Sequence, residues 1–334
     1  MKTQPHQAHR RALLVAAGIA MVAPLAAAQD AAKDFPSKVI TIVVPYAAGG
    51  SSDTRARQLG EKLQKILGKP VIIENKAGGN GNIGTDYIAR ATPDGHTIGI
   101  GNFAPLTVNK ALYPKLTYDP KDLVPVALIE KGPVVLVVSN DKSPYKSLKD
   151  LLAAAKATPG KMSYASAGSG GAYHLAGEMF NVATGTSSVH IPYKGGGPAT
   201  NDLLGGTVDY MFDMVPATMG YVKATPPKMR ALALASDKRL PTLPDVPTFA
   251  ELGIQNMEIS NWIGIIAPKG TPPNIVSKLN QAINQALKEP DLAQRITSMG
   301  NVIGGGSPQE FGSFIAAESA RWTKLIQERG IRGE

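Results

Sequence analysis

The chain contains no cysteine, and this absence removes several kinds of chemistry at once. Disulfide bonds, thiolate metal sites, thiol nucleophiles and a lipidated N-terminal cysteine all require that residue. Aromatic residues are also scarce, at 6% of the sequence, and the lysines are scattered. Nucleic-acid binding surfaces combine basic stripes with interleaved aromatic side chains. The sequence therefore does not predict a nucleic-acid binder, although its formal net charge is +9.

What is present is typical of a globular protein with a sizeable core: 334 residues, of which 43% are hydrophobic and 18% charged. This length exceeds one ordinary domain and suits two domains of about 100 to 200 residues each. The 35 glycines and 26 prolines indicate many loops. A positive net charge in a glycine-rich chain favours an anionic small-molecule partner. Two lobes and an anionic ligand are therefore the first expectations.

Residues 1–28 have the three parts of a secretory signal peptide: a basic start, an apolar middle and a run of small residues at the end. A membrane anchor is the alternative, but the apolar stretch is short, consists of small residues and is broken by Pro24. We expect export with cleavage after Ala28. The three basic residues of this segment leave with it, so the net charge of the mature chain becomes +6.

Beyond this segment, apolar β-branched runs alternate with amphipathic helical patterns, which predicts an α/β fold with largely parallel strands. The predicted strands are Lys38–Val44, Val71–Glu74, Thr97–Gly101, Val134–Val138, Met162–Ala165, Val189–Ile191, Tyr210–Phe212, Arg230–Ala235 and Trp262–Ala267. The predicted helices are Thr54–Leu67, Thr85–Arg90, Ser147–Ala157, Ala172–Thr184, Pro198–Leu204, Asn274–Leu287 and Pro308–Gln327. Two such sets suggest two sheets, between which the chain crosses twice.

Four times a strand runs into a loop of small residues and then into a helix. These corners are Ala47–Asp53, Ala77–Asn82, Ser166–Gly171 and Lys194–Gly197. Glycine lets a ligand approach the backbone closely, and the helix start offers unpaired N–H groups with a partial positive charge. Such a corner binds anions. Tight turns are the alternative for any one corner, but four recurrences favour a shared anionic ligand.

Two enzyme motifs are matched only in part. Gly79–Gly84 has the letters of the GxGxxG dinucleotide fingerprint, but it begins five residues after Glu74, and no acidic residue ends the next strand. Ser169 stands in a motif close to the GxSxG nucleophile elbow, with His174 five residues further on in a helix. That histidine is poorly placed to act as a general base for Ser169. A helix-capping serine and a pocket histidine are the simpler interpretation.

Metal binding is not predicted. After removal of the signal peptide three histidines remain, with no HExxH motif and no closely spaced pair. Asp209 and Asp213 share one strand, but a calcium loop needs more carboxylates at close spacing. No cofactor is expected either.

Many short motifs, in order along nearly the whole mature chain, resemble the receptors of tripartite tricarboxylate transporters, also called Bug-type receptors. They are Pro45–Asp53, Val71–Lys76, Gly81–Gly84, Pro93–Thr97, Ser163–Ser166, His174–Glu178, His190–Gly195, Asp202–Gly206, Arg230–Ala233, Leu243–Thr248 and Ala267–Pro272. The resemblance implies a two-lobed periplasmic-binding-protein fold of type II, the Venus flytrap, with two crossing segments. It places residues 29–131 and 259–334 in the first lobe and residues 132–258 in the second.

The resemblance also implies a function and a site. The protein is expected in the periplasm as a monomeric receptor, not an enzyme, that captures a small organic carboxylate for the membrane subunits of the transporter. The ligand would lie between the lobes and contact Tyr46, Ala48, Gly49, Ser51, Asn82, Ala167, Gly168, Ser169, His174, Lys194 and Asp213. Of these, Asp213 is the residue expected to select for an amino or other donor group on the ligand. Dicarboxylates, tricarboxylates, acidic amino acids and aromatic acids all fit.

Two alternatives stay open: an exported serine hydrolase that uses Ser169, and a ligand sensor that is not coupled to transport. The sequence also departs from the usual family pattern at two site positions. Tyr46 stands where phenylalanine is common, and Gly171 stands where a serine or threonine is common. A hydroxyl contact expected at position 171 is therefore in doubt, and Ser169 is the residue that would compensate.

Overall fold

The computed structural model describes residues 34–48, 50–113, 115–193 and 196–332. Its strands are β1 (Ile40–Val44), β2 (Val71–Asn75), β3 (Thr97–Asn102), β4 (Leu123–Ser139), β5 (Ser163–Ser166), β6 (Val189–Pro192), β7 (Tyr210–Met214), β8 (Met229–Leu234), β9 (Ser260–Pro268) and β10 (Val302–Gly305). Its α-helices are α3 (Ser51–Leu67), α4 (Asn82–Ala89), α5 (Asn109–Leu112), α6 (Leu148–Ala157), α7 (Ala172–Thr184), α8 (Gly196–Gly205), α9 (Val215–Val222), α10 (Pro273–Leu287), α11 (Pro290–Thr297) and α12 (Pro308–Arg329). Short turns of other helix types are η1 (Gly79–Gly81), η2 (Ala104–Val108) and η3 (Pro120–Asp122).

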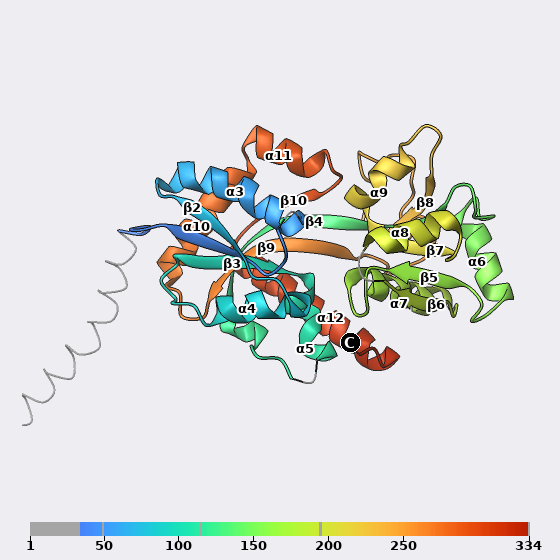
Figure 1. Ribbon diagram of the computed structural model, residues 1–334, viewed down its shortest axis with the longest axis horizontal. Helices are drawn as coiled ribbons and strands as arrows, with labels where there is room; N and C mark the ends of the chain where they lie inside the picture. Colours follow the sequence, from blue (N-terminus) through green and yellow to red (C-terminus); the bar gives the residue numbers. More distant parts are fainter. Residues whose placement is uncertain (1–33, 49, 114, 194–195, 333–334) are drawn as a thin grey trace, which may run out of the picture.

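The strands form two groups, each covered by helices, which confirms the predicted two-lobed α/β fold (Figure 1). The two groups are not separate sheets as predicted, because β4 joins them into one ten-stranded sheet. In the first lobe, β1 pairs in parallel with β2 and β3, and β3 continues antiparallel to β9, β4 and β10. In the second lobe, β5 pairs in parallel with β6 and β7, while β4 lies antiparallel to β7 and β8.

Two strands join the lobes, as predicted for the crossing segments. β4 pairs with β9 from Leu123 to Pro133 and then, from Val134 onward, with β7 and β8 of the second lobe. β9 begins opposite Pro133 and ends in the first lobe, at Pro268. The sequence predicts only the second half of β4, because Pro125, Gly132 and Pro133 interrupt its apolar pattern. The residue boundaries of the lobes stay a prediction.

Helix α12 touches both lobes. Phe311 near its start is buried on the first-lobe sheet, and Trp322 and Ile326 are buried further along. At its end Arg329 Nε donates a hydrogen bond to Glu178 Oε2 on α7, over 2.7 Å. The long C-terminal helix thus packs along the first lobe and ends against the second (Figure 1).

A close approach between α12 and the crossing strand β9 requires glycine at position 264. A Cβ added there would lie 2.2 Å from Phe311 Cζ and 2.8 Å from the Ala127 carbonyl oxygen on β4. We therefore expect Gly264→Ala to lower the free energy of unfolding by about 1 to 3 kcal/mol, measured by urea denaturation. Gly220→Ala on α9 is the control, because an added Cβ meets nothing within 4 Å there. Equal stability of the two variants would contradict this packing.

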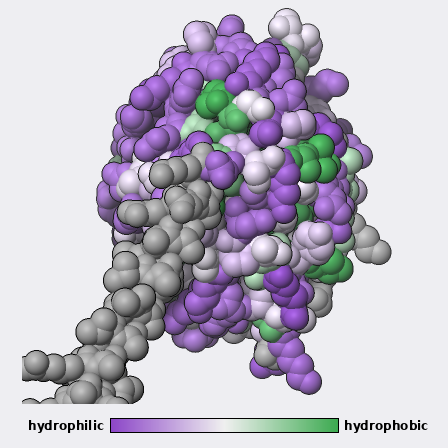
Figure 2. Space-filling model, turned by 90° about the vertical axis from the view of Figure 1, so that its left-hand side faces the viewer, coloured by the Kyte–Doolittle hydropathy of each residue, from purple (hydrophilic) through white to green (hydrophobic). Residues whose placement is uncertain are grey.

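The far end of the first lobe is mostly hydrophilic, with small hydrophobic groups that are separate from one another (Figure 2). Exposed large apolar side chains are likewise spread over several elements, for example Ile72 on β2 and Val182 on α7. Within the described ranges, no helix is both long and apolar enough to cross a bilayer.

Candidate functional site

The first-lobe side of the site is the corner between β1 and α3. Gly50 is the N-cap of α3, with φ −76° and ψ 172°, and no side chain caps the helix. No N-cap side chain therefore occupies the N–H groups of the first turn. Asp53 in this turn is buried and paired with Arg57, whose Nη2 lies 3.0 Å from Asp53 Oδ1. Its charge is thus balanced, and the helix start keeps its attraction for an anion.

Tyr46 and Asn102 form the wall beside this corner. The Tyr46 hydroxyl donates to Asn102 Oδ1 over 2.9 Å, and burial raises the pKa of Tyr46 to about 12. The tyrosine hydroxyl therefore stays protonated and gives its only proton to Asn102. Because Oδ1 of Asn102 accepts that proton, its amide NH₂ is the group left to donate. Tyr46 orients Asn102, a side chain at the end of β3 that the sequence analysis did not select.

The second-lobe side is the corner between β5 and α7, and its geometry repeats that of the first. Gly171 is the N-cap of α7, with φ −76° and ψ 171°, again without a side-chain cap. The preceding loop turns through two residues in the left-handed range, Gly168 with φ 140° and Gly170 with φ 74°. Gly170 is buried against Leu112 of α5, so this loop also touches the first lobe.

A cavity of about 250 Å³ lies between these two corners. Its lining residues come from both helix starts, from the end of β3 and from the crossing strand β9: Tyr46, Gly50, Ser51, Ser52, Asn102, Phe103, Ala104, Ala172 and Asn261. Two uncapped helix N-termini thus border one small cavity, one from each lobe. This arrangement can hold a small anion by backbone N–H groups and the amides of Asn102 and Asn261.

Asp213 does not itself line the cavity. It is 6% exposed, and its Oδ1 accepts from the Met214 backbone N–H over 2.8 Å; burial raises the pKa of this carboxyl, and the nearby Tyr173 side chain partly opposes that rise. Asn261 of the cavity wall in turn acts on Tyr173, where it partly opposes the rise in the hydroxyl pKa that burial causes. Burial raises the pKa of the Asp213 carboxyl to about 6, so its charge changes near neutral pH.

The structure brings together only some of the residues predicted from the sequence. Tyr46 and Ser51 line the cavity, and Asp213 is linked to it through Tyr173. Gly49 and Lys194 lie outside the described residues. The other predicted contacts do not line this cavity, namely Ala48, Asn82, Ala167, Gly168, Ser169 and His174.

Two of these residues are engaged in contacts with the protein itself. Asn82 Oδ1 accepts hydrogen bonds from Asn109 Nδ2 over 2.6 Å and from the Tyr118 hydroxyl over 3.1 Å. His174 is 8% exposed, and its Nδ1 accepts from the Gly170 backbone N–H over 2.9 Å. Because that nitrogen is occupied, His174 is badly placed to act as a general base for Ser169, and this disfavours the hydrolase alternative.

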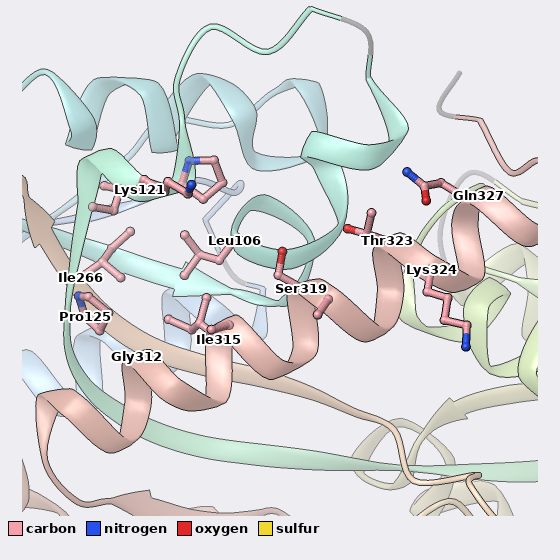
Figure 3. Close-up of a pocket in the computed structure, with 14 residues that line it drawn as sticks. Leu106, Lys121, Pro125, Ile266, Gly312, Ile315, Ser319, Thr323, Lys324 and Gln327 are labelled. Carbon is pink, nitrogen blue, oxygen red and sulfur yellow. The ribbon is translucent and has the colours of Figure 1, made fainter.

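A larger cavity of about 550 Å³ lies elsewhere, between α12 and the start of β4 (Figure 3). Its wall is mostly apolar, with Leu106, Ile266 and Ile315 facing it, and Lys324 points away. None of the glycine-rich corners reaches it. The smaller cavity between the lobes is therefore the candidate carboxylate site, because the starts of α3 and α7 and the amides of Asn102 and Asn261 border it. Among the residues described, no group of three or more histidines and carboxylates could hold a metal ion.

Two lobes, two crossing strands and a small cavity between the lobes, bordered by two helix N-termini, define a solute-binding protein of the periplasmic type. Residues 55–331 match the family described as tripartite tricarboxylate transporter family receptor, and the chain belongs to this family. The family consists of periplasmic solute receptors, not enzymes, as the sequence predicts.

Relatives and solved structures agree with this assignment. BugT of Bordetella pertussis is 39% identical over 322 residues, which cover 96% of this chain and 98% of BugT. The structure of R. palustris Rpa4515 with adipate is 34% identical, with a TM-score of 0.79 over 90% of this chain and 100% of that one. MatC from Rhodopseudomonas palustris with bound malate is 33% identical, with a TM-score of 0.74 over 87% of this chain and 100% of that one.

Proposed function

We propose that the protein captures a small organic anion by a carboxylate held between the N-termini of α3 and α7. The observation that carries this proposal is the cavity between the lobes, which both uncapped helix starts border. Charge-assisted hydrogen bonds to a carboxylate are worth about 1.5 to 3 kcal/mol each, so three or four offset much of the ligand's desolvation. Contacts divided between two lobes stabilise a closed form only while the ligand is bound.

Further parts of the proposal concern the protein's place in the cell. The chain would be exported by its N-terminal segment, cleaved after Ala28 and held in the periplasm as a monomer. Its closed form would be what the membrane subunits of a tripartite tricarboxylate-type transporter recognise. The family match and the signal-peptide pattern support this assignment.

The ligand class can be tested by a thermal-shift panel on the mature protein. Rpa4515 with adipate and MatC with malate make dicarboxylates the first candidates, and acidic amino acids and aromatic acids complete the panel. A ligand at one hundred times its Kd is expected to add about 2.7 kcal/mol to the free energy of unfolding. A panel in which neutral sugars stabilise the protein and no carboxylate does would contradict the proposal.

The charge on Asp213 is expected to discriminate between ligands with and without an amino group. With a pKa of about 6, this carboxyl is mostly neutral at pH 5.5 and mostly charged at pH 7.5. A charged Asp213 repels a dianion and attracts an ammonium group. Relative to Asp213→Asn, the affinity of the wild-type protein for adipate should therefore fall severalfold from pH 5.5 to 7.5, and that for L-aspartate should rise. Titration calorimetry measures the affinity for each ligand at each pH. If the wild-type protein and Asp213→Asn show parallel pH profiles, Asp213 does not act on the bound ligand.

A further inference from the structure

Two histidine rings lie stacked directly below the second-lobe loop. The rings of His174 on α7 and His190 on β6 have centroids 3.7 Å apart and an angle of 6° between their planes. Each ring contacts a different part of the loop between β5 and α7, His190 near its beginning and His174 near its end. The pair thus spans the segment that leads into the Gly171 cap.

The contacts of Ser166 favour a proton on Nε2 of His190. Ser166 Oγ donates its only proton to the Gly168 carbonyl oxygen over 2.9 Å and accepts from the Gly168 N–H over 3.2 Å. His190 Nε2 lies 2.6 Å from the same Oγ. With the hydroxyl proton directed to the Gly168 carbonyl oxygen, this short contact requires a proton on His190 Nε2.

His174 is fixed in the same way by a backbone donor. Its Nδ1 accepts the Gly170 N–H over 2.9 Å, so a neutral ring carries its proton on Nε2. Gly170 is buried, and its N–H would be costly to leave without an acceptor. Both rings therefore use the Nε2-protonated form, one as a donor and the other as an acceptor toward the loop.

The surroundings favour neutral rings. Burial lowers the pKa of both, and for His190 burial and the neighbouring His174 lower it to about 3. Two groups pack close to the pair: the Tyr164 ring of β5, 5.0 Å from His190, and the Glu178 carboxylate of α7. Glu178 is bound by the Tyr164 hydroxyl over 2.8 Å and by Arg329 of α12, so its charge is already balanced.

We infer that the neutral His174 and His190 pair is a positioning unit that fixes the loop from Ser166 to Gly170, so that the N-terminus of α7 faces the ligand carboxylate. This inference rests on the proposed function, because the loop matters only if α7 contacts the ligand. Neither histidine touches the ligand cavity. Their role is to hold the second-lobe corner in its binding geometry before the ligand arrives.

The protonation of the two histidines and their contacts with the loop can be tested without ligand. We expect the ¹⁵N NMR shifts of both imidazoles at pH 7 to show protonated Nε2 and unprotonated Nδ1. We also expect hydrogen exchange at the Gly170 amide to be slow in the wild-type protein and much faster in His174→Phe, which keeps a ring but has no acceptor. In His174→Asn the amide oxygen can take the place of Nδ1, so slow exchange should return. A protonated Nδ1 on His174, or unchanged exchange in His174→Phe, would overturn the inference whatever the ligand.

A second arm uses adipate as the probe. Loss of one buried hydrogen bond that orients the loop should weaken adipate binding about tenfold in His174→Phe, with most of the affinity restored in His174→Asn. His190→Phe and His190→Gln form the matched pair for the other ring, since a glutamine amide can replace the Nε2 donor. Wild-type affinity in both phenylalanine variants would refute the positioning role. If no carboxylate binds the wild-type protein, the proposed function is wrong. The NMR and hydrogen-exchange results then still test whether the two histidines hold the loop.

Discussion

Gly50→Asp is expected to abolish ligand binding while leaving the fold as stable as before, or more stable. Gly50 has the extended backbone conformation of an N-cap, and an added Cβ lies no closer than 3.6 Å to the Ala47 carbonyl oxygen. Aspartate at this position accepts the first-turn N–H groups of α3 with its own carboxylate. The aspartate carboxylate therefore takes the place that the ligand carboxylate would occupy. Loss of two charge-assisted hydrogen bonds corresponds to an affinity at least about 100-fold lower.

The controls separate occupation of the site from damage to it. Gly50→Ala adds a Cβ but no cap, so it should bind nearly as well as the wild-type protein. Gly171→Asp makes the same change at α7, where the added Cβ meets only the Gly168 carbonyl oxygen, at 3.9 Å. Thermal unfolding should show a gain of up to about 1 kcal/mol in either aspartate variant. Unchanged affinity in both would exclude the two helix starts from the site.

Glu130→Leu is expected to cause the largest loss of stability, about 3 to 5 kcal/mol. Glu130 on β4 is paired with Arg55 on α3, with 2.8 Å between Oε2 and Nη2, and both side chains are about 95% buried. Its Oε2 also accepts from Asn301 Nδ2 over 2.9 Å. Without Glu130 the Arg55 guanidinium stays buried with no counter-charge. This ion pair attaches the ligand-binding helix to the crossing strand.

The double variant Arg55→Met with Glu130→Leu should recover most of that loss, because neither charge then remains buried alone. Glu328→Ala is the surface control: its pair with Lys324 is 3.9 Å long and well exposed, so its removal should cost less than about 1 kcal/mol. Urea denaturation of the wild-type protein, the single variants Arg55→Met and Glu130→Leu and the double variant gives the coupling energy. A single Glu130→Leu variant as stable as the surface control would contradict the role of the ion pair.

Local sequence patterns predict most elements and corners of this protein, but not α5, α9, α11 and β10. Helix α7 begins and ends at the predicted residues, because Gly171 caps its start and Gly185, with φ 63°, ends it. The glycine-rich corners after β1 and β5 likewise lie where the spacing of strands and helices puts them. In each case the signal lies within a few residues of the feature that it predicts.

Residues that reach the site through long-range pairing are not predictable in this way. Asn261 lines the cavity only because β9 crosses beside β4, and nothing in its own neighbourhood indicates a ligand. Asn102 ends β3, which is a detectable position, but its role depends on the Tyr46 hydroxyl, 56 residues away in sequence. His174 shows another limit: a histidine near a binding loop suggests a ligand contact, whereas only the structure shows that its Nδ1 accepts from the Gly170 N–H of that loop.

A crystal structure of the protein with the carboxylate that stabilises it most in the thermal-shift panel is the most direct test of the central claim. We expect one carboxylate between the lobes, within hydrogen-bond distance of N–H groups in the first turns of both α3 and α7. A ligand held by one lobe alone, or bound in the larger cavity beside α12, would contradict it.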